Sequence, residues 1–152
     1  MDQITTELNK FDPQTMWITA LLVLAFLATK FIIPRLVAGG APFVDNKAVQ
    51  ERINSGEEVV VLDVRTPGEF TGRLGHVPGA VNLPLADIAG RLTANAEEMD
   101  ALKSTPIYVM CRTANRSPSA ARLLRKRGFT DVSVIKGGMS AWKRSGLPVE
   151  GL

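Results

Sequence analysis

Short apolar runs alternate with amphipathic stretches along residues 43–152 of this chain. The unbroken β-branched run at 59–62 is typical of a strand that is buried on both faces. Similar runs predict further strands at 80–83, 107–110 and 132–135. The stretches between them predict helices at 47–54, 86–92, 97–102, 118–127 and 139–145. Because strands alternate with helices, the pattern predicts an α/β domain with a mainly parallel sheet flanked by helices.

A second pattern, at residues 16–36, is apolar on all sides of a helix rather than along one stripe. About 20 residues are needed to cross the hydrocarbon of a membrane, and this segment suffices if Lys30 extends towards the head groups. We therefore expect one transmembrane helix that attaches the chain to a membrane. The expected organisation is a short tail at 1–15, the transmembrane helix at 16–36, a linker at 37–42 and the α/β domain at 43–152.

Two other interpretations of the apolar segment compete with a membrane anchor. A cleaved signal peptide would begin with a basic region, whereas Lys10 is outnumbered by acidic residues before the segment. A buried core helix is compatible with the uncharged run at 16–29, whose length is ambiguous. That run has no polar stripe, however, and the rest of the chain can form a domain without it. A single-pass anchor is therefore the favoured interpretation.

The basic residues around the apolar segment predict its orientation. Only Lys10 precedes the uncharged run at 16–29, whereas Lys30, Arg35, Lys47 and Arg52 follow it closely. The positive-inside rule then places the tail outside a bacterial-type cytoplasmic membrane and the α/β domain in the cytosol. A single free cysteine suits that reducing compartment.

Composition narrows the classes of function that this chain can have. With 152 residues, 45% of them hydrophobic and 22% charged, the chain has room for one soluble domain and an appendage. One tyrosine and no interleaving of basic with aromatic residues argue against nucleic acid as a partner. A single cysteine excludes an intramolecular disulfide and a cysteine-based zinc site. No metal and no cofactor are predicted.

Cys111 is the candidate nucleophile, because it follows the predicted strand at 107–110 directly. In parallel sheets, sites form at the carboxyl ends of the strands. The alternative is a lone cysteine acting as a small buried apolar residue. The polar, partly basic composition of the residues that follow, 112–117, favours a reactive thiol instead.

The loop that begins at Cys111 has features that favour a thiolate. Ser117 is the expected N-cap of the next helix, and Pro118 is expected at its first position. Loop N–H groups and the positive end of the helix dipole would then face the thiol. Arg112 and Arg116 add positive charge beside it and are expected to bind anions.

Residues 43–152 resemble a single rhodanese domain. The resemblance covers nearly all of the predicted soluble part, and its motifs occur in the family's order. The matching blocks are Val61-Leu62-Asp63-Val64-Arg65-Thr66-Pro67-Gly68-Glu69-Phe70, then 75–84, the loop 111–117, 128–132, 136–139 and 141–142. Together with the apolar segment, the chain is similar to bacterial membrane-anchored rhodanese proteins.

The resemblance implies a sulfurtransferase. Cys111 would take a sulfane sulfur from a small thiosulfate-type donor, become a persulfide, and pass the sulfur to a thiol or cyanide acceptor. It implies no particular protein partner. By the same resemblance, the residues expected to contact the substrate and to surround it with backbone N–H groups are Arg112, Thr113, Ala114, Asn115, Arg116 and Ser117. The residues expected to support the structure around the site are Asp63, Arg65, Glu69 and His76.

Two departures from the family pattern stand out. Ala114 occupies a loop position that is commonly glycine in relatives, and alanine is strained there if the position requires a positive φ. Four residues, 71–74, separate the Glu69-Phe70 pair from Gly75-His76, which predicts an enlarged loop.

Two other functions remain as alternatives. Phosphatases and arsenate reductases of related fold use a Cys-x5-Arg loop, but the arginine position of such a loop is Ser117 here. A non-enzymatic module that docks a membrane partner is the other alternative, and the polar loop around Cys111 argues against it. His76, the only histidine, lies in a Gly-His-Val-Pro-Gly turn and is interpreted as structural rather than as part of a catalytic triad.

Overall fold

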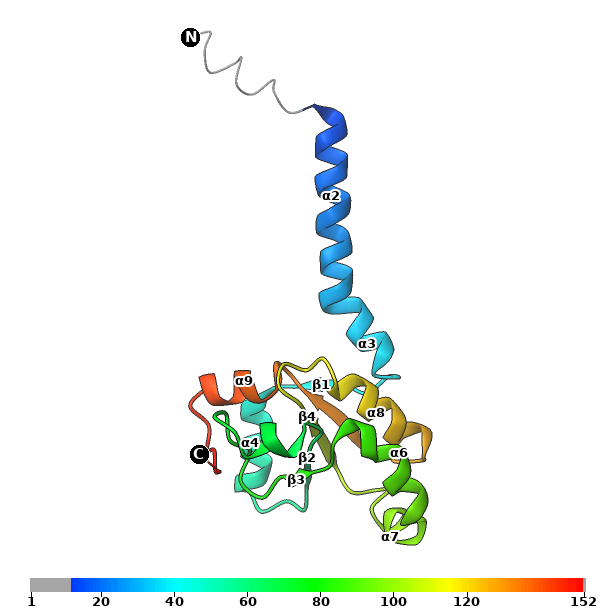
Figure 1. Cartoon of the computed structure of the whole chain (residues 1–152), viewed down its shortest axis with the longest axis vertical. Helices are drawn as coiled ribbons and strands as arrows, with labels where there is room; N and C mark the ends of the chain where they lie inside the picture. Colours follow the sequence, from blue (N-terminus) through cyan, green and yellow to red (C-terminus); the bar gives the residue numbers. More distant parts are fainter. Residues whose placement is uncertain (1–11, 152) are drawn as a thin grey trace. The chain divides into compact units, whose positions relative to one another are not determined.

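The computed structural model describes residues 12–151 and divides the chain into two compact units, residues 1–34 and 35–152. The described part of the first unit contains helix α2 (Pro13–Leu27) and the π-helical turn η1 (Ala28–Ile32), and α3 (Ile33–Val37) includes the boundary between the units; Figure 1 labels α2 and α3. Asp12 caps α2 by accepting the N–H of Gln14. The helix thus begins earlier than the predicted residue 16.

The helix Pro13–Val37 contains 25 residues and is apolar enough to cross a membrane. At 1.5 Å per residue it is about 37 Å long, against about 30 Å for the hydrocarbon layer. The π-helical turn arises where Pro34 supplies no N–H to the preceding turn. The N–H of Ile33 bonds to the carbonyl of Ala28 instead. None of the side chains in α2, η1 or α3 is buried.

The second unit is built on a five-stranded sheet, entirely parallel, in the order β1-β5-β4-β2-β3. The fold class predicted from the sequence is confirmed. The strands are β1 (Phe43–Val44), β2 (Val60–Asp63), β3 (Val81–Asn82), β4 (Ile107–Met110) and β5 (Val132–Ile135). The helices are α4 (Asn46–Asn54), α5 (Pro67–Phe70), α6 (Leu85–Ala94), α7 (Ala96–Ala101), α8 (Ser117–Lys126) and α9 (Gly138–Arg144).

Two apolar layers cover the two faces of the sheet. Successive side chains of a strand point to opposite faces. In β4, Val109 therefore packs in one layer beneath α6 and α8, whereas Met110 packs in the other layer with α4 and α9. Figure 1 shows these two pairs of helices on opposite sides of the sheet. All four residues of β4 are buried, as expected of a central strand with helices on both faces.

The structure differs from the sequence prediction in short elements and at boundaries. Strand β1 and helix α5 were not predicted, because two and four residues are too short for a recognisable period. Residues 38–41 lie in the stretch expected to be a linker, yet Ala38 and Ala41 are buried in the layer beneath α8. This stretch is thus packed onto the domain.

Candidate active site

The loop that begins at Cys111 connects the carboxyl end of β4 with α8. Cys111 is only 1% exposed, and the loop closes around its sulfur. The Sγ atom accepts the backbone N–H of Arg116 at 3.3 Å and the hydroxyl of Ser117 at 3.1 Å. Arg112, Thr113 and Asn115 are exposed, whereas Ala114 and Arg116 are partly buried.

These hydrogen bonds favour the thiolate form of Cys111. Burial raises the pKa of the thiol, because a charge is poorly solvated in the interior. The hydroxyl and N–H of Ser117 and the N–H groups of Arg116 and Thr113 outweigh this effect. The net result is a pKa of Cys111 below its ordinary value, as expected of a nucleophilic cysteine.

The expected role of Ser117 as a helix cap is wrong. Ser117 is the first residue of α8, and Arg116 is the N-cap, without a capping hydrogen bond from its side chain. The Ser117 side chain is fully buried, and its hydroxyl donates to the cysteine sulfur instead. A charged acceptor makes a stronger hydrogen bond than a neutral one, which accounts for this choice. Ser117 therefore lies at the predicted site but performs a different task there.

We expect the Ser117→Ala substitution to raise the pKa of Cys111. The substitution removes the largest of the contributions that lower this pKa, and burial continues to raise it. Thiolate absorbance during a pH titration should therefore appear at higher pH than in the wild type, since Cys111 is the only thiol. Ser119→Ala, on the same helix, is the matched control and should leave the titration unchanged. Coincident curves for Ser117→Ala and the wild type would contradict this role.

Ala114 lies at the middle of the loop with a φ of 64°, the only non-glycine residue with a positive φ among residues 12–151. Its methyl group packs against the layer beneath α8. An L-residue in this region costs about 1–2 kcal/mol compared with a right-handed conformation. The loop therefore keeps its conformation despite strain at this position.

The Ala114→Gly substitution is expected to leave the protein at least as stable as the wild type. Glycine relieves the strain, and this offsets the larger entropy of the unfolded chain, which costs about 0.4–1 kcal/mol. Ala89→Gly, at an exposed position in α6, is the matched control and should lower the free energy of unfolding by about 1 kcal/mol. Equal losses in the two variants, measured by urea unfolding, would show that Ala114 is not strained.

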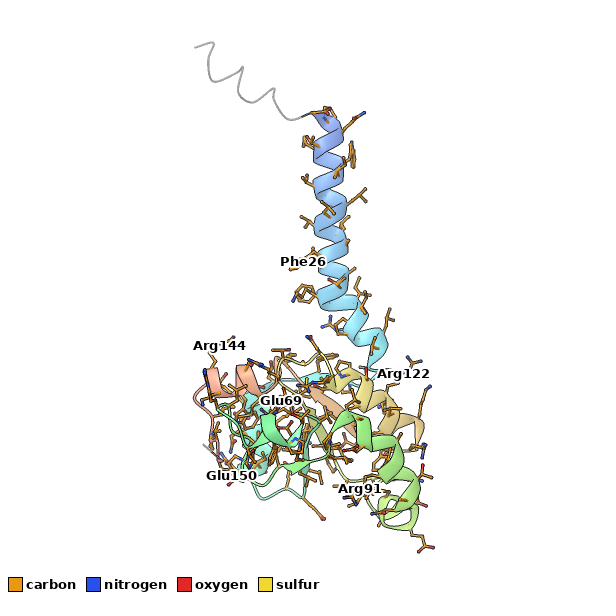
Figure 2. All side chains as sticks on the ribbon, in the orientation of Figure 1. Phe26, Glu69, Arg91, Arg122, Arg144 and Glu150 are labelled. Atoms are coloured by element: carbon orange, nitrogen blue, oxygen red, sulfur yellow. The ribbon has the colours of Figure 1, made fainter. Side chains whose placement is uncertain are left out.

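Arg116, expected to bind anions, is paired with a carboxylate. Its guanidinium makes two hydrogen bonds of 2.7 Å to the carboxylate of Glu69 on α5; Glu69 is labelled in Figure 2. The hydrogen bond from Arg116 lowers the pKa of Glu69 from 4.5 to about 2, so the pair stays ionised at any ordinary pH. The backbone N–H of Arg116 donates to the sulfur. Its side chain joins the loop to α5 through Glu69, which raises the pKa of Arg116, and it also interacts with Cys111, which adds to that rise.

Asp63 and Arg65 form a fully buried ion pair that supports α5. The Arg65 guanidinium contacts both carboxylate oxygens of Asp63, at 2.6–2.9 Å. It also donates to the carbonyl of Glu69 at 3.0 Å and to the carbonyl of Gly75 at 2.7 Å. The pair thus connects the end of β2 to Glu69, and Glu69 connects in turn to the cysteine loop through Arg116.

His76 is tied to neighbours other than the cysteine. Its ring stacks on Phe70, with centroids 3.7 Å apart, and its Nδ1 atom lies 3.0 Å from the Phe70 carbonyl. Its Nε2 atom lies 3.3 Å from the carboxylate of Glu150 (labelled in Figure 2), and the backbones of these two residues form a bridge. These contacts hold the C-terminal segment onto the loop before β3.

Gly138 is a site residue that the sequence alone did not reveal. A Cβ atom at this position would overlap the carbonyl oxygen of Cys111, and its φ of 58° also favours glycine. The next N–H group, of Met139, donates to that carbonyl at 2.8 Å. The turn at Gly137-Gly138 was the available signal, but only the fold shows that it contacts the cysteine.

A cleft of about 540 Å³ opens beside the cysteine loop. It is lined by Arg65, Gly68, Glu69, Gly72, Arg73, Leu74, Arg112 and Lys143. Three of these residues come from the insertion at 71–74, which the sequence predicted as an enlarged loop. Arg73, Arg112 and Lys143 have no carboxylate partner among the described residues, so the cleft carries uncompensated positive charge. Within residues 12–151, no cluster of histidine, cysteine, aspartate or glutamate could hold a metal ion.

Comparison with known proteins agrees with this geometry. Residues 45–145 match the model of the rhodanese-like domain. A sulfurtransferase of Allochromatium vinosum is 31% identical over 106 residues, which cover 70% of this chain and 92% of that protein. The chloroplastic thiosulfate sulfurtransferase 16 of Arabidopsis thaliana is 39% identical over 95 residues, covering 59% of this chain and 78% of that protein.

A solved structure shows the same fold. The rhodanese-like domain of an Anabaena protein superposes with a TM-score of 0.62 and is 36% identical, covering 73% of this chain and 80% of that one. The family model matches well over half of the chain, and it includes β2, β4, α8 and the cysteine loop between them. The chain therefore belongs to the rhodanese-like family.

Proposed function

We propose that this protein is a membrane-anchored sulfurtransferase that carries sulfane sulfur on Cys111. The observation that carries the proposal is the environment of the Cys111 sulfur, which accepts hydrogen bonds from Arg116 and Ser117. The lowered pKa of Cys111 supports the same assignment, because the thiolate is the reactive form. Sulfurtransferase relatives in bacteria and plants add to this support.

The reaction has two displacement steps at sulfur. First, the Cys111 thiolate attacks the outer sulfur of thiosulfate, an S–S bond forms to Sγ, and the bond to sulfite breaks with its electron pair leaving on sulfite. Second, a thiolate or cyanide attacks the same outer sulfur, and the pair of the broken S–S bond returns to Sγ. The N–H groups of Thr113 and Arg116 and the hydroxyl of Ser117 stabilise the anionic sulfur at each stage.

Positive charge in the cleft supports an anionic donor. Arg73, Arg112 and Lys143 line the cleft beside the loop and have no carboxylate partner within the described residues. Thiosulfate and the departing sulfite are both dianions, which these side chains attract. Arg116, which is paired with Glu69 but also interacts with Cys111, and the exposed Arg112 are the loop arginines that would contact the donor.

Mass spectrometry tests the proposal directly. Incubation of the reduced full-length protein with thiosulfate should add the mass of one sulfur atom to the peptide that contains Cys111, and cyanide should remove it. A protein that never gains this mass with thiosulfate or with an organic persulfide is not a sulfur carrier. Hydrolysis of a phosphate ester, without sulfur transfer, would instead support the phosphatase alternative.

Geometry argues against the phosphatase alternative. Such enzymes use an arginine six positions after the cysteine to hold a phosphoryl group, and that position is Ser117, whose hydroxyl donates to the sulfur. The neighbouring Arg116 is turned towards Glu69. A small terminal sulfur atom is a better match than a phosphoryl group for this shorter, closed loop.

We propose further that α2 to α3 span a membrane, with the tail outside and the catalytic domain in the cytosol. The support is the length and apolar composition of the helix Pro13–Val37 and the charge bias, because the basic residues lie near the carboxyl end of the helix and just after it, whereas only Lys10 precedes it. The site and the helix would then belong to a single-pass protein of a bacterial-type cytoplasmic membrane.

Labelling with an impermeant maleimide is expected to show this topology. Because Cys111 is buried, the reporters are Thr6→Cys in the tail and the exposed Ser145→Cys, each in the Cys111→Ser background. Intact cells should label the cysteine at position 6 only, and lysed cells should label both. The reverse pattern would place the catalytic domain outside, and labelling of both reporters in intact cells would exclude an anchor with one end inside.

A further inference from the structure

A second cleft, of about 550 Å³, lies beside the carboxyl-terminal half of α8, and no residue of the cysteine loop lines it. It is lined by Gly39, Arg122, Arg125, Lys126, Gly128, Phe129 and Thr130. The notable members are three basic side chains, all exposed, from two successive turns of α8. None of the three has an ion pair or hydrogen bond to another residue of the described part of the chain.

A favourable interaction with the dipole of α8 explains only some of the three basic residues that line the cleft. Arg125 and Lys126 lie in the last turn, where cations interact favourably with the helix dipole. Arg122 lies a turn earlier and gains nothing from that effect, which falls off within the last turn. Arg127, next in the sequence, is occupied by a hydrogen bond to Thr93. The three cations, which have no partner within residues 12–151, therefore line one cleft, and helix stabilisation does not fully explain why they are there.

The remaining wall of the cleft is the segment that follows the apolar helix. Gly39 lies two residues after Val37, where α3 ends. Its backbone packs so closely on α8 that a Cβ atom would lie 3.1 Å from Cγ of Arg122. A Cβ on the next residue, Gly40, would lie 3.9 Å from Nη2 of Arg125. Burial of Ala38 fixes this segment against α8.

Covalent connection thus limits how far the cleft can lie from the end of the apolar helix. Two residues span at most about 7 Å, less than one Debye length at physiological ionic strength. If Pro13–Val37 crosses a membrane, its end at Val37 lies among the lipid head groups, and cations of the cleft lie within their electrostatic reach. Guanidinium groups bind phosphate oxygens in a bidentate manner, which suits Arg122 and Arg125.

We propose that the cleft formed by Gly39, Arg122, Arg125 and Lys126 binds the phosphate head group of an anionic phospholipid. This inference rests on the membrane anchor proposed above, but not on sulfur transfer. Bound lipid would hold the domain at the membrane surface through α8, in addition to the tether supplied by the helix. Each cation near an anionic surface contributes about fivefold to binding. Neutralising all three should weaken lipid binding roughly a hundredfold.

The test uses the full chain purified in a mild non-ionic detergent and titrated with phosphatidylglycerol, with bound lipid counted by native mass spectrometry. The variant is Arg122→Gln/Arg125→Gln/Lys126→Gln. The control Lys47→Gln/Arg91→Gln/Arg144→Gln removes the same charge from exposed positions outside the cleft; Arg91 and Arg144 are labelled with Arg122 in Figure 2. Wild type and control should bind phosphatidylglycerol alike and in preference to phosphatidylcholine, and the cleft variant should lose this preference.

Three outcomes would overturn the proposal. They are unchanged binding by the cleft variant, equal loss in the control, and displacement of the lipid by inorganic phosphate at the same concentration, which would indicate a site for free anions. Thermal unfolding of each variant in the same detergent separates loss of the site from loss of the fold. Flotation with phosphatidylcholine vesicles after alkaline extraction tests the membrane anchor separately. If the wild type and all variants fail to float, the anchor is refuted. If the cleft variant floats but no longer binds phosphatidylglycerol selectively, the anchor holds and the loss is assigned to the cleft.

Discussion

The Cys111→Ser substitution should abolish sulfur transfer and leave the fold intact. A serine hydroxyl does not ionise near neutral pH and cannot hold a sulfane sulfur, so both displacement steps lose their nucleophile. The chain has no second cysteine that could substitute. The turnover of thiosulfate with cyanide should fall to the level of the uncatalysed reaction, a loss of several orders of magnitude. Production of thiocyanate and of sulfite are the two measurements.

A control is needed because Cys111 is also a buried side chain in the layer beneath α8. Urea unfolding of the Cys111→Ser variant should give a free energy within about 1–3 kcal/mol of the wild type, as expected for a buried hydroxyl that retains Ser117 and Arg116 as neighbours. A folded variant that still produces thiocyanate at the wild-type rate would refute the role of Cys111 as sulfur carrier.

The Arg65→Met substitution is expected to cause the largest loss of stability. It removes the guanidinium but leaves the carboxylate of Asp63 fully buried without its counterion. The carbonyls of Glu69 and Gly75 also lose their donor. Breaking a buried pair from one side costs about 3–5 kcal/mol, a large share of the roughly 5–15 kcal/mol that keeps a domain folded. Urea unfolding measures the loss.

Two further variants separate the buried charge from loss of packing. Lys136→Met removes one partner of the exposed pair between Lys136 and Asp45 and should cost no more than about 1 kcal/mol. Adding Asp63→Asn to Arg65→Met should restore part of the lost stability, because the unpaired charge is gone. If Arg65→Met costs no more than Lys136→Met, the buried pair does not support the fold in the way that its geometry suggests.

Much of the α/β domain could be predicted from the sequence because its strands are buried on both faces. The runs that became β2, β4 and β5 are almost continuously apolar, and they are too short to form buried helices. The place of Cys111 at the end of β4 followed from the same pattern. Helix boundaries differed by one or two residues, where capping rather than apolar period decides the end of a helix.

Side-chain partners at the site could not be predicted, because they depend on segments far apart in sequence. Glu69 and Arg116 are 47 residues apart, and only the parallel pairing of β2 with β4 brings α5 and the cysteine loop together. For the same reason, Arg116 could not be predicted to form an ion pair. Its positive charge was evident in the sequence, but the carboxylate that neutralises it was not.

The amino-acid sequence by itself determined the strand–helix alternation, the apolar helix and the place of Cys111 directly after a strand. It also pointed to Cys111 as the candidate nucleophile and to Ala114 as a residue that is strained if its φ is positive. These depend on local properties, namely hydrophobic period, side-chain chemistry and the conformational range of a residue. The tertiary structure alone decided that Ser117 donates to the sulfur, that Arg116 is paired and that Gly138 contacts Cys111. Hydrogen bonds and close contacts act over only a few ångströms, so their partners exist only once the parallel sheet has brought the loops together.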